Sequence, residues 1–487
     1  MSRPKAHQSS AKKKQQSVGG QASCSGTEKL SGTRYDRLLD HYLVLFLFLA
    51  LVALTLVSAD MPLLVGLLGL ALCVAGIVQR PSKVDLWVLI PLIIYQVFSF
   101  ISSYLTYKGI SIGLIAGFET SQMFNPIIYL LLACLSREEH LWLKRLCVAW
   151  AGCISAVGLV QFLIPALAGR ASRLGGVVGG PNTLGIYLVV AWFILYHCTG
   201  EQGDEKPVWL VRLEPLLLSA LALTLSMGSF VAMAAGILFL ACVRLRRDGP
   251  VRETLHFICG LLARATLGIG LGVVMYVAAR RSGQPWLCIP LMLYLLALCW
   301  YWDRVLAFLR DLPVAAVMLT GVGVLVAAAT VLCRPNAVAT FQERLAMMRN
   351  GIGYLTTRPL WGLGPYQWQL WNYYDNDLYF HTSHIHNVLL HIGVERGLPA
   401  MAMAFIVVVR GFCKKTEPGD KAGFLAFVVH NMMDTAFFYP GFTVMTLMGV
   451  TEPGSGGKKI PAAAVRLVFA LCSVVYLMYI LYGFGLI

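Results

Sequence analysis

Charged residues are scarce in this chain. Asp, Glu, Lys and Arg make up 13% of its 487 residues, whereas hydrophobic residues make up 58%. Apolar runs of about 20 residues recur along most of the chain, and no large soluble domain interrupts them. Runs of this length cross a bilayer as helices that satisfy their own backbone hydrogen bonds. The sequence therefore predicts an all-α fold, a polytopic transmembrane helical bundle.

Paired cysteines and internal repeats are also lacking. The 13 cysteines are scattered, none belongs to a Cys-x-x-Cys pair, and most lie inside apolar runs. This pattern excludes a disulfide framework and is typical of small packing residues. The absence of a repeat excludes a solenoid. We expect a single polytopic membrane domain over residues 41–487.

Pro, Gly and charged residues separate the apolar runs, and the runs between them predict about 12–15 spans. The expected spans lie near 42–59, 62–79, 86–105, 120–135, 146–166, 183–198, 209–226, 228–243, 260–279, 286–302, 313–333, 396–412, 421–437, 438–451 and 462–485. The two short runs on either side of Pro440 are also compatible with one broken helix. A single long connection, roughly 334–386, separates two of the spans.

The net charge of +15 would indicate nucleic acid in a soluble protein, but in a membrane protein it is divided between two faces. Residues 1–40 are polar and basic, with Lys12, Lys13 and Lys14, and predict a disordered cytoplasmic tail that touches anionic lipid. If the tail is inside, the alternate connections carry Lys and Arg freely. This pattern favours a cytoplasmic N-terminus and no nucleic-acid partner.

Lysine is nearly missing from the opposite, outer face. The basic residues expected there are Lys108, Arg170, Arg173, Arg280, Arg281, Arg334, Arg344, Arg349 and Arg358. Arginine presents a planar fork of donors that suits phosphate oxygens, so this bias favours a diphosphate-bearing ligand. The alternative is an accident of a small sample.

The outer connection 334–386 is rich in aromatic residues as well as arginine. Its rings are Trp361, Tyr366, Trp368, Trp371, Tyr373, Tyr374, Tyr379 and Phe380. Such rings either stack on sugars or form an interfacial aromatic belt, and the sequence leaves both open. An amphipathic helix is expected from Gln342, ended by a Gly/Pro turn in residues 358–365.

His386 follows this connection and precedes a helical segment, which places it near the outer membrane face. An imidazole can accept a proton from a hydroxyl nucleophile, and the neighbouring Asn387 can orient a hydroxyl or an imidazole. Helical spacing puts Asn387, His391 and Glu395 on one face, which is also compatible with a simple polar stripe. A structural interfacial histidine is the plain alternative for each of these rings.

Metal binding is a further reading of the histidines in this region. His381, His384, His386 and His391 form a cluster, with Asp375 and Asp377 nearby, but they lack a recognised zinc spacing and a cysteine ligand. We therefore predict no metal and no cofactor.

Two other segments contain polar groups that suit a site. His430 and Asp434 are one helical turn apart in an apolar run, and intramembrane ionisable residues are functional candidates. The glycine-rich segment 170–185 contains Arg173 and leads into Pro181-Asn182-Thr183, the start of a helix whose N-terminus favours anions.

Together these segments resemble the O-antigen ligase and polymerase superfamily of integral-membrane glycosyltransferases. The most specific match is the pattern H-N-x-x-L-x6-G, formed by His386, Asn387, Leu390 and Gly397. Further matches are Arg173 with Gly-Pro-Asn-Thr-Leu-Gly, Arg344 with the Arg-Pro-Leu-Trp-Gly-Leu-Gly-Pro segment, and the His430/Asp434 pair. The resemblance extends from about residue 170 to 440. One departure is Met227, which stands where the family often has the arginine of Ser-Arg-Gly.

The resemblance implies a metal-independent, inverting transfer from a polyprenyl-diphosphate-linked glycan at the outer face of the plasma membrane. His386 would be the general base, assisted by Asn387. Arg173 and Arg344 would bind the diphosphate, with Arg358, Arg280 and Arg281 as further candidates. An outer residue such as Arg280 or Arg281 would substitute for the arginine missing at Met227, or the donor would be held differently. Supporting polar residues would be His384, Glu395, His430 and Asp434.

The resemblance leaves two acceptors open: another lipid-linked glycan, as in a polymerase, or a lipid or other anchor, as in a ligase. Met227 slightly favours a polymerase, because the missing arginine weakens the match to ligases. Other partners implied are membrane lipid and polysaccharide-assembly machinery. The competing hypotheses are a transporter or flippase of lipid-linked oligosaccharide and a non-catalytic scaffold. A transporter predicts charges on both leaflets, whereas here the polar groups concentrate at one face.

Overall fold

The structure is a computed structural model of the chain. It describes residues 41–56, 62–78, 83–108, 123–198, 207–246, 250–334, 336–375, 379–414, 416–451 and 457–486. The tail predicted at 1–40 lies outside these residues.

Helices dominate the described part of the chain, which confirms the predicted polytopic helical bundle. Eight of the described helices are long and apolar enough to cross a membrane, or nine if one bent pair counts as a span. Shorter apolar helices account for several of the remaining predicted spans. Within the described ranges, one two-stranded ladder pairs β1 (Lys83–Val84) antiparallel with β2 (Lys458–Lys459).

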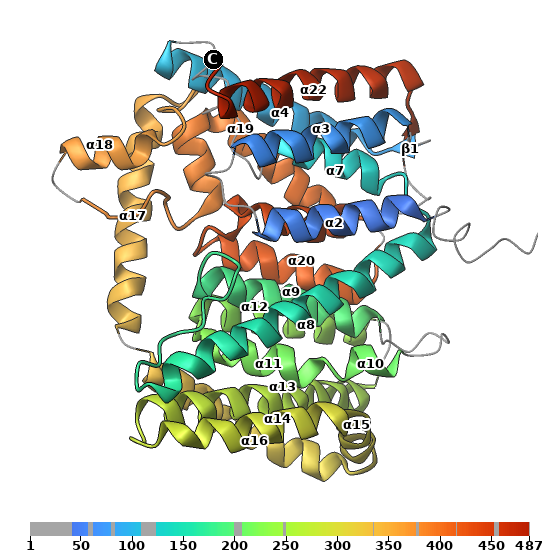
Figure 1. Ribbon diagram of the computed structural model, residues 1–487, viewed down its shortest axis with the longest axis vertical. Helices are drawn as coiled ribbons and strands as arrows, with labels where there is room; N and C mark the ends of the chain where they lie inside the picture. Colours follow the sequence, from blue (N-terminus) through green and yellow to red (C-terminus); the bar gives the residue numbers. More distant parts are fainter. Residues whose placement is uncertain are drawn as a thin grey trace, which may run out of the picture. The chain divides into compact units, whose positions relative to one another are not determined.

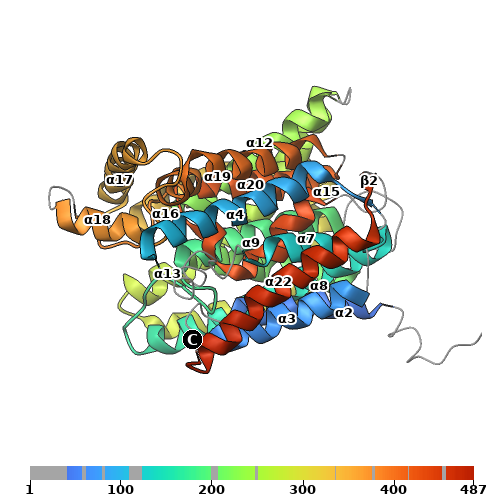
Figure 2. The same cartoon turned by 90° about the horizontal axis from the view of Figure 1, so that it is seen from above.

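The N-terminal helices pack beside the last helix of the chain. These helices are α2 (Tyr42–Leu56), α3 (Pro62–Val78), α4 (Leu86–Tyr107), α7 (Asn125–Leu132), α8 (Arg137–Leu167) and α22 (Ala462–Gly483). Figure 2 shows α22 running alongside α3. Gly69 permits this approach, because a Cβ at that position would overlap the ring of Tyr476.

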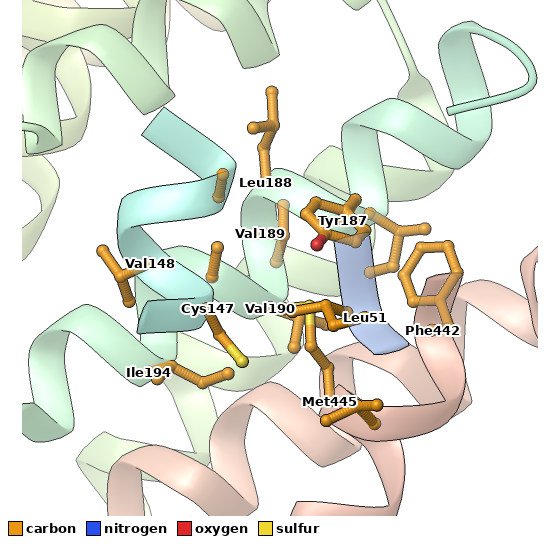
Figure 3. Close-up of a cluster of buried hydrophobic side chains, with 14 of the residues drawn as sticks. Leu51, Cys147, Val148, Tyr187, Leu188, Val189, Val190, Ile194, Phe442 and Met445 are labelled. Carbon is orange, nitrogen blue, oxygen red and sulfur yellow. The ribbon is translucent and has the colours of Figure 1, made fainter. Parts of the chain in front are cut away.

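The helix α9 (Pro181–Cys198) lies at the centre of the bundle, and nearly all of its side chains are buried. Figure 3 shows five of its residues packed against Cys147 of α8, Leu51 of α2, and Phe442 and Met445 near the C-terminus; they are Tyr187, Leu188, Val189, Val190 and Ile194. This cluster ties helices that are far apart in sequence into one core, and it positions the loop that precedes α9.

The next helices are α10 (Val208–Val211), α11 (Glu214–Thr224), α12 (Met227–Arg246), α13 (Val251–Arg280), η1 (Pro285–Leu287), α14 (Cys288–Trp300), α15 (Trp302–Asp311) and α16 (Pro313–Cys333). They occupy the lower part of Figure 1, where α11 and α12 pack against α9, and α16 packs against α13. The chain bends by 69° between α14 and α15. Helices α13 and α16 run in the same direction. The Thr320 hydroxyl of α16 donates to the Cys259 carbonyl of α13, and farther along both helices Gly323 lies against Thr266.

The predicted outer connection contains two helices, α17 (Ala337–Thr357) and α18 (Gln367–Asp375), which lie together at one side of Figure 1. The expected amphipathic helix thus begins earlier than Gln342 and ends just before the predicted Gly/Pro turn.

The C-terminal part contains α19 (Val388–Cys413), α20 (Pro418–Asn431), η2 (Ala436–Phe438), η3 (Pro440–Phe442) and α21 (Thr443–Val450). The predicted spans 421–437 and 438–451 are therefore two helices joined by short 3-10 turns around Pro440. The predicted span 396–412 is the second half of α19, which begins at Val388 and is kinked at Gly397.

Candidate functional site

Asn387 begins helix α19 and fixes the position of the residue before it. Its side-chain oxygen accepts a hydrogen bond from the Leu390 N–H at 3.0 Å, which caps one of the free donors at the helix start. Its side-chain nitrogen donates to the Met432 carbonyl at 3.3 Å. Asn387 therefore ties the start of α19 to the end of α20 and holds His386 between them.

The kink at Gly397 receives the Gly/Pro segment 358–365. Gly397 has φ 87°, and a Cβ there would overlap the carbonyl of Leu360. Across the contact, the N–H groups of Leu363 and Gly364 donate to carbonyls of α19 at 2.8 and 2.9 Å, and the Leu398 N–H donates to the Pro359 carbonyl at 2.8 Å. Only glycine allows the backbone of segment 358–365 to come this close to α19. This explains why the motif that begins at His386 has a glycine at position 397. The contact anchors the end of α17 next to α19.

His386, Asp434 and Arg344 form the centre of the site. Nδ1 of His386 lies 3.7 Å from Oδ1 of Asp434, beyond an ordinary hydrogen bond but within ion-pair distance. Oδ2 of Asp434 accepts from Arg344 at 2.9 Å, and Arg344 also donates to the Met433 carbonyl. The side chain of His386 is 20% exposed, whereas those of Arg344 and Asp434 are 10% and 7% exposed. Only the imidazole of the three is substantially accessible.

The carboxylate of Asp434 is held in its ionised form. Burial opposes ionisation, but the nearby His386, His430 and Arg344 outweigh it and hold the pKa of Asp434 well below its usual range. A carboxylate facing Nδ1 favours the tautomer with the proton on Nδ1 and stabilises the imidazolium. Nε2 of His386 is then the nitrogen available to accept a proton.

His430 lies close to Asp434, in the interior of the protein. It is fully buried at the end of α20, and neither ring nitrogen has a hydrogen-bond partner among the described residues. A Cβ on Gly228 would come within 3.3 Å of the ring, so Gly228 leaves room for it. Met227, the position of the missing arginine, begins α12 immediately beside Gly228.

Two arginines converge on the end of α11. Nε of Arg173 donates to the Thr224 carbonyl at 2.8 Å, and Arg334 donates to the Leu225 carbonyl at 3.4 Å. Arg173 also donates to the Asn182 side chain at 2.8 Å. Burial and then the neighbouring cations Arg334 and Arg344 lower the pKa of Arg173 to about 10, so it stays charged at neutral pH.

Arg334 was not among the residues predicted for the site. Its only sequence signal was its place at the outer end of an expected span, which it shares with several other arginines. The pKa of Arg334 is lowered by burial and by Arg344, which places it in the same group of charges.

The remaining predicted arginines lie outside the His386–Asp434–Arg344 centre. Arg280 and Arg281 end α13 and are exposed, and Arg280 donates to the Ala171 carbonyl at 3.2 Å in the loop that carries Arg173. Arg358 is exposed and its guanidinium lies 5.7 Å from the centre of the Trp371 ring.

His384 and Glu395 belong to a neighbouring polar group built around His391. The His384 ring stacks on Phe438 at 4.7 Å and contacts His391 at 4.8 Å. Nε2 of His391 lies 3.3 Å from Glu395, while its Nδ1 accepts from the Ile385 N–H at 3.4 Å. Burial, and then the neighbouring His391, lower the pKa of His384 to about 3, so this ring is neutral near pH 7. The group fixes the backbone next to His386.

A metal centre is not formed by the residues that the structure describes. Among them, no three His, Cys, Asp or Glu side chains are arranged to hold an ion. Asp377, part of the alternative metal reading, lies outside the described residues.

Part of the chain matches a known protein family. Residues 216–405 match a family model described as O-antigen ligase. The matched segment begins in α11 and ends in α19, so it contains Arg334, Arg344 and His386, whereas Arg173, His430 and Asp434 lie outside it. A search of curated proteins found no match.

Proposed function

We propose, from the O-antigen ligase domain that residues 216–405 carry, that this protein is a membrane glycosyltransferase of surface polysaccharide biosynthesis. It transfers or polymerises an oligosaccharide from a polyprenyl diphosphate onto a hydroxyl of a glycan, lipid or other acceptor at the outer face of the plasma membrane. The observation that carries the proposal is the contact of the partly exposed His386 with the buried, ionised Asp434.

The proposed step forms one bond and breaks one. The acceptor oxygen attacks the anomeric carbon from the face opposite the diphosphate, which inverts that centre. Nε2 of His386 takes the hydroxyl proton, and Asp434 stabilises the resulting imidazolium. The bond between the anomeric carbon and the diphosphate oxygen breaks, and its electron pair leaves with the polyprenyl diphosphate. The step needs no metal.

Arginines stabilise the leaving group in this mechanism. Arg173 and Arg334 each retain further N–H groups beyond those donated to the end of α11. Preorganised cations of this kind act on charge that develops in the transition state. Arg344 adds positive charge and, through its bond to Asp434, orients the carboxylate.

An apolar pocket beside the centre suits the polyprenyl tail. It lies between α4, α19, α20 and α21, and its walls include Tyr95, Val388, Ile392, Met432 and Phe437. Val388 follows Asn387 in the chain, and Met432 is the residue whose carbonyl accepts from Asn387. A tail in this pocket would therefore start close to His386.

The test is transfer in vitro from a polyprenyl-diphosphate oligosaccharide by the purified full-length protein. We expect His386→Ala to lose transfer, His381→Ala to keep it, and a chelator to have no effect on the wild type. His381 is a suitable control because it is an exposed histidine of the same loop. Full transfer activity of His386→Ala would exclude His386 as the general base. Loss of wild-type activity with the chelator would indicate that a metal ion is needed. Movement of the lipid-linked glycan across the membrane without transfer would indicate a transporter.

A further inference from the structure

Three tyrosines form an exposed aromatic surface at the C-terminal end of α18 and shortly after it. Tyr373 and Tyr374 of α18 are 57% and 73% exposed, and Tyr379 is 38% exposed. The Tyr373 ring meets both neighbours edge to face, with its centre 5.6 Å from that of Tyr374 and 5.3 Å from that of Tyr379. Aromatic rings prefer this arrangement, so the three rings support one another. We call them the tyrosine surface.

Polar bonds between α17 and α18 hold the tyrosine surface in place. The Asn372 side chain donates to Asn350 of α17 at 3.2 Å and accepts from the Phe380 N–H at 2.7 Å. Asp375 accepts a hydrogen bond from the hydroxyl of Tyr354 in α17. Phe380 and Asp375 are direct neighbours, along the chain, of rings in the tyrosine surface. The rings are therefore fixed before a ligand arrives, which lowers the entropy cost of binding.

The tyrosine surface lies beyond the ends of the bundle helices. At the start of α18, the Trp368 N–H donates to the buried Glu395 of α19 at 3.4 Å. Tyr374 comes six residues later, roughly 9 Å farther along the helix at 1.5 Å per residue. Figures 1 and 2 both show α18 pointing away from the bundle, with its C-terminal end outermost. Rings of an interfacial belt lie level with the ends of the spanning helices, so this position favours a ligand on the water side over contact with lipid.

The polar groups of the tyrosine surface suit a sugar. Sugar rings have C–H faces that pack on aromatic rings, and hydroxyl groups that need donors and acceptors. Among the residues that the structure describes, none forms a hydrogen bond with the hydroxyls of Tyr373, Tyr374 and Tyr379. Asp375 uses one carboxylate oxygen for Tyr354, which leaves the other as an acceptor. A purely apolar partner would leave these groups unpaired, at a cost in binding.

Helix α17 and the loop before α19 join the tyrosine surface to the centre around His386. Helix α17 contains both Arg344 and Tyr354, which are ten residues or roughly 15 Å apart along it. Tyr379 precedes His386 by seven residues, a stretch of chain that spans at most about 25 Å. An oligosaccharide that extends outward from His386 therefore passes close to α18.

We propose that the tyrosine surface is a carbohydrate subsite, on which one sugar of the glycan stacks at a distance from the bond that reacts. The Tyr373 and Tyr374 rings supply the stacking faces, and Asp375 accepts from a sugar hydroxyl. This inference rests on the proposed function, because the glycan is the one bound at His386. The sugar belongs to the donor or to the acceptor, which share this chemistry. A contact that is equal in the bound substrate and in the transition state lowers KM without raising kcat.

The first test measures transfer kinetics with long and short glycans. Donors carry either a full oligosaccharide or a single sugar on polyprenyl diphosphate, and acceptors are varied in the same way. We expect Tyr374→Ala to raise KM about fivefold for one long substrate, with kcat little changed and the short substrate unaffected. The substrate whose KM rises identifies the donor or the acceptor as the source of the sugar. Tyr374→Phe, which keeps the ring, is expected to stay near the wild type.

The control for this test is a tyrosine outside the tyrosine surface. Tyr294 of α14 is 58% exposed, and Tyr294→Ala is expected to keep the KM values of the wild type. Unchanged KM in Tyr374→Ala, or an equal rise for long and short substrates, would overturn the proposal.

The second test measures binding without transfer, so that its result does not depend on the reaction. Saturation-transfer NMR is recorded on full-length His386→Ala protein, with and without Tyr374→Ala, using soluble oligosaccharides released from the donor and from the acceptor. We expect one oligosaccharide to bind His386→Ala and to bind the double variant about fivefold more weakly.

The outcomes of the second test separate the subsite from the reaction. Equal binding to the two proteins would overturn the subsite. Binding that depends on Tyr374, in a protein whose wild type shows no transfer, would support the subsite and contradict the proposed function. Loss of a co-purifying protein in Tyr374→Ala, with sugar binding unchanged, would assign the tyrosine surface to a protein partner instead.

Discussion

The chemistry proposed for His386 depends on one neighbouring charge. Replacing Asp434 by Asn keeps the size of the side chain but removes the charge that favours Nδ1–H and stabilises the imidazolium. We expect Asp434→Asn to lower kcat for transfer by about 100-fold or more and to change KM for the donor little. Steady-state kinetics check this, with Asp311→Asn, an exposed aspartate at the end of α15, as control. A fall confined to KM would contradict the assigned role.

The low pKa of His384 predicts a pH-dependent contribution to stability. In the folded state the pKa is about 3, whereas an unfolded histidine titrates near 6.5. Below about pH 6.5 the unfolded state binds the extra proton, so His384 lowers the stability as the pH falls from 6.5 toward 3. We expect His384→Phe, which retains a ring to stack on Phe438, to lose less thermal stability than the wild type between pH 7 and pH 5. Equal losses would show that the ring is not held neutral.

Arg334 is the residue that the sequence did not single out and the structure adds to the group. We expect Arg334→Ala to reduce kcat/KM for the donor by about tenfold or more, and Arg334→Lys to restore part of it, because lysine keeps the charge but lacks the planar fork. Arg349→Ala, an exposed arginine of α17, is the control. Wild-type kinetics in Arg334→Ala would exclude the residue from the site.

At the scale of elements, the kink of α19 determines where segment 358–365, which joins α17 to α18, attaches. Gly397 has a positive φ, and a side chain there would overlap the Leu360 carbonyl. We expect Gly397→Ala to destabilise the protein by about 1–3 kcal/mol, measured by thermal unfolding in detergent. Gly353→Ala in α17 is the control, because its Cβ would meet nothing within 4 Å. Equal stability of the two variants would contradict the close approach.

Hydropathy predicts the elements well because the length and polarity of a span are local properties. The runs that became α4, α9 and α22 show this. Start points are harder to predict, as α19 illustrates: its first turns contain His391 and Glu395 and do not resemble a span. They are helical because the Asn387 cap and the contact with segment 358–365 support them.

At the scale of the whole molecule, the candidate site brings together residues that are far apart in sequence. His386 could be predicted from a short motif, but the bond of Arg334 to Leu225 joins positions 109 residues apart, and that of Arg344 to Asp434 joins positions 90 apart. Such contacts depend on how α11, α16, α17 and α20 pack, which residue spacing does not reveal. The sequence predicted that arginines gather on one face of the membrane, and the structure shows that Arg173, Arg334 and Arg344 lie in one group of charges.

The central claim is that His386 removes the proton in the transfer step. The most direct test is the single-turnover rate of glycan transfer by His386→Ala at saturating donor and acceptor, where binding no longer limits the rate. The account predicts a rate at least about 100-fold below that of the wild type. A single-turnover rate equal to that of the wild type would contradict it.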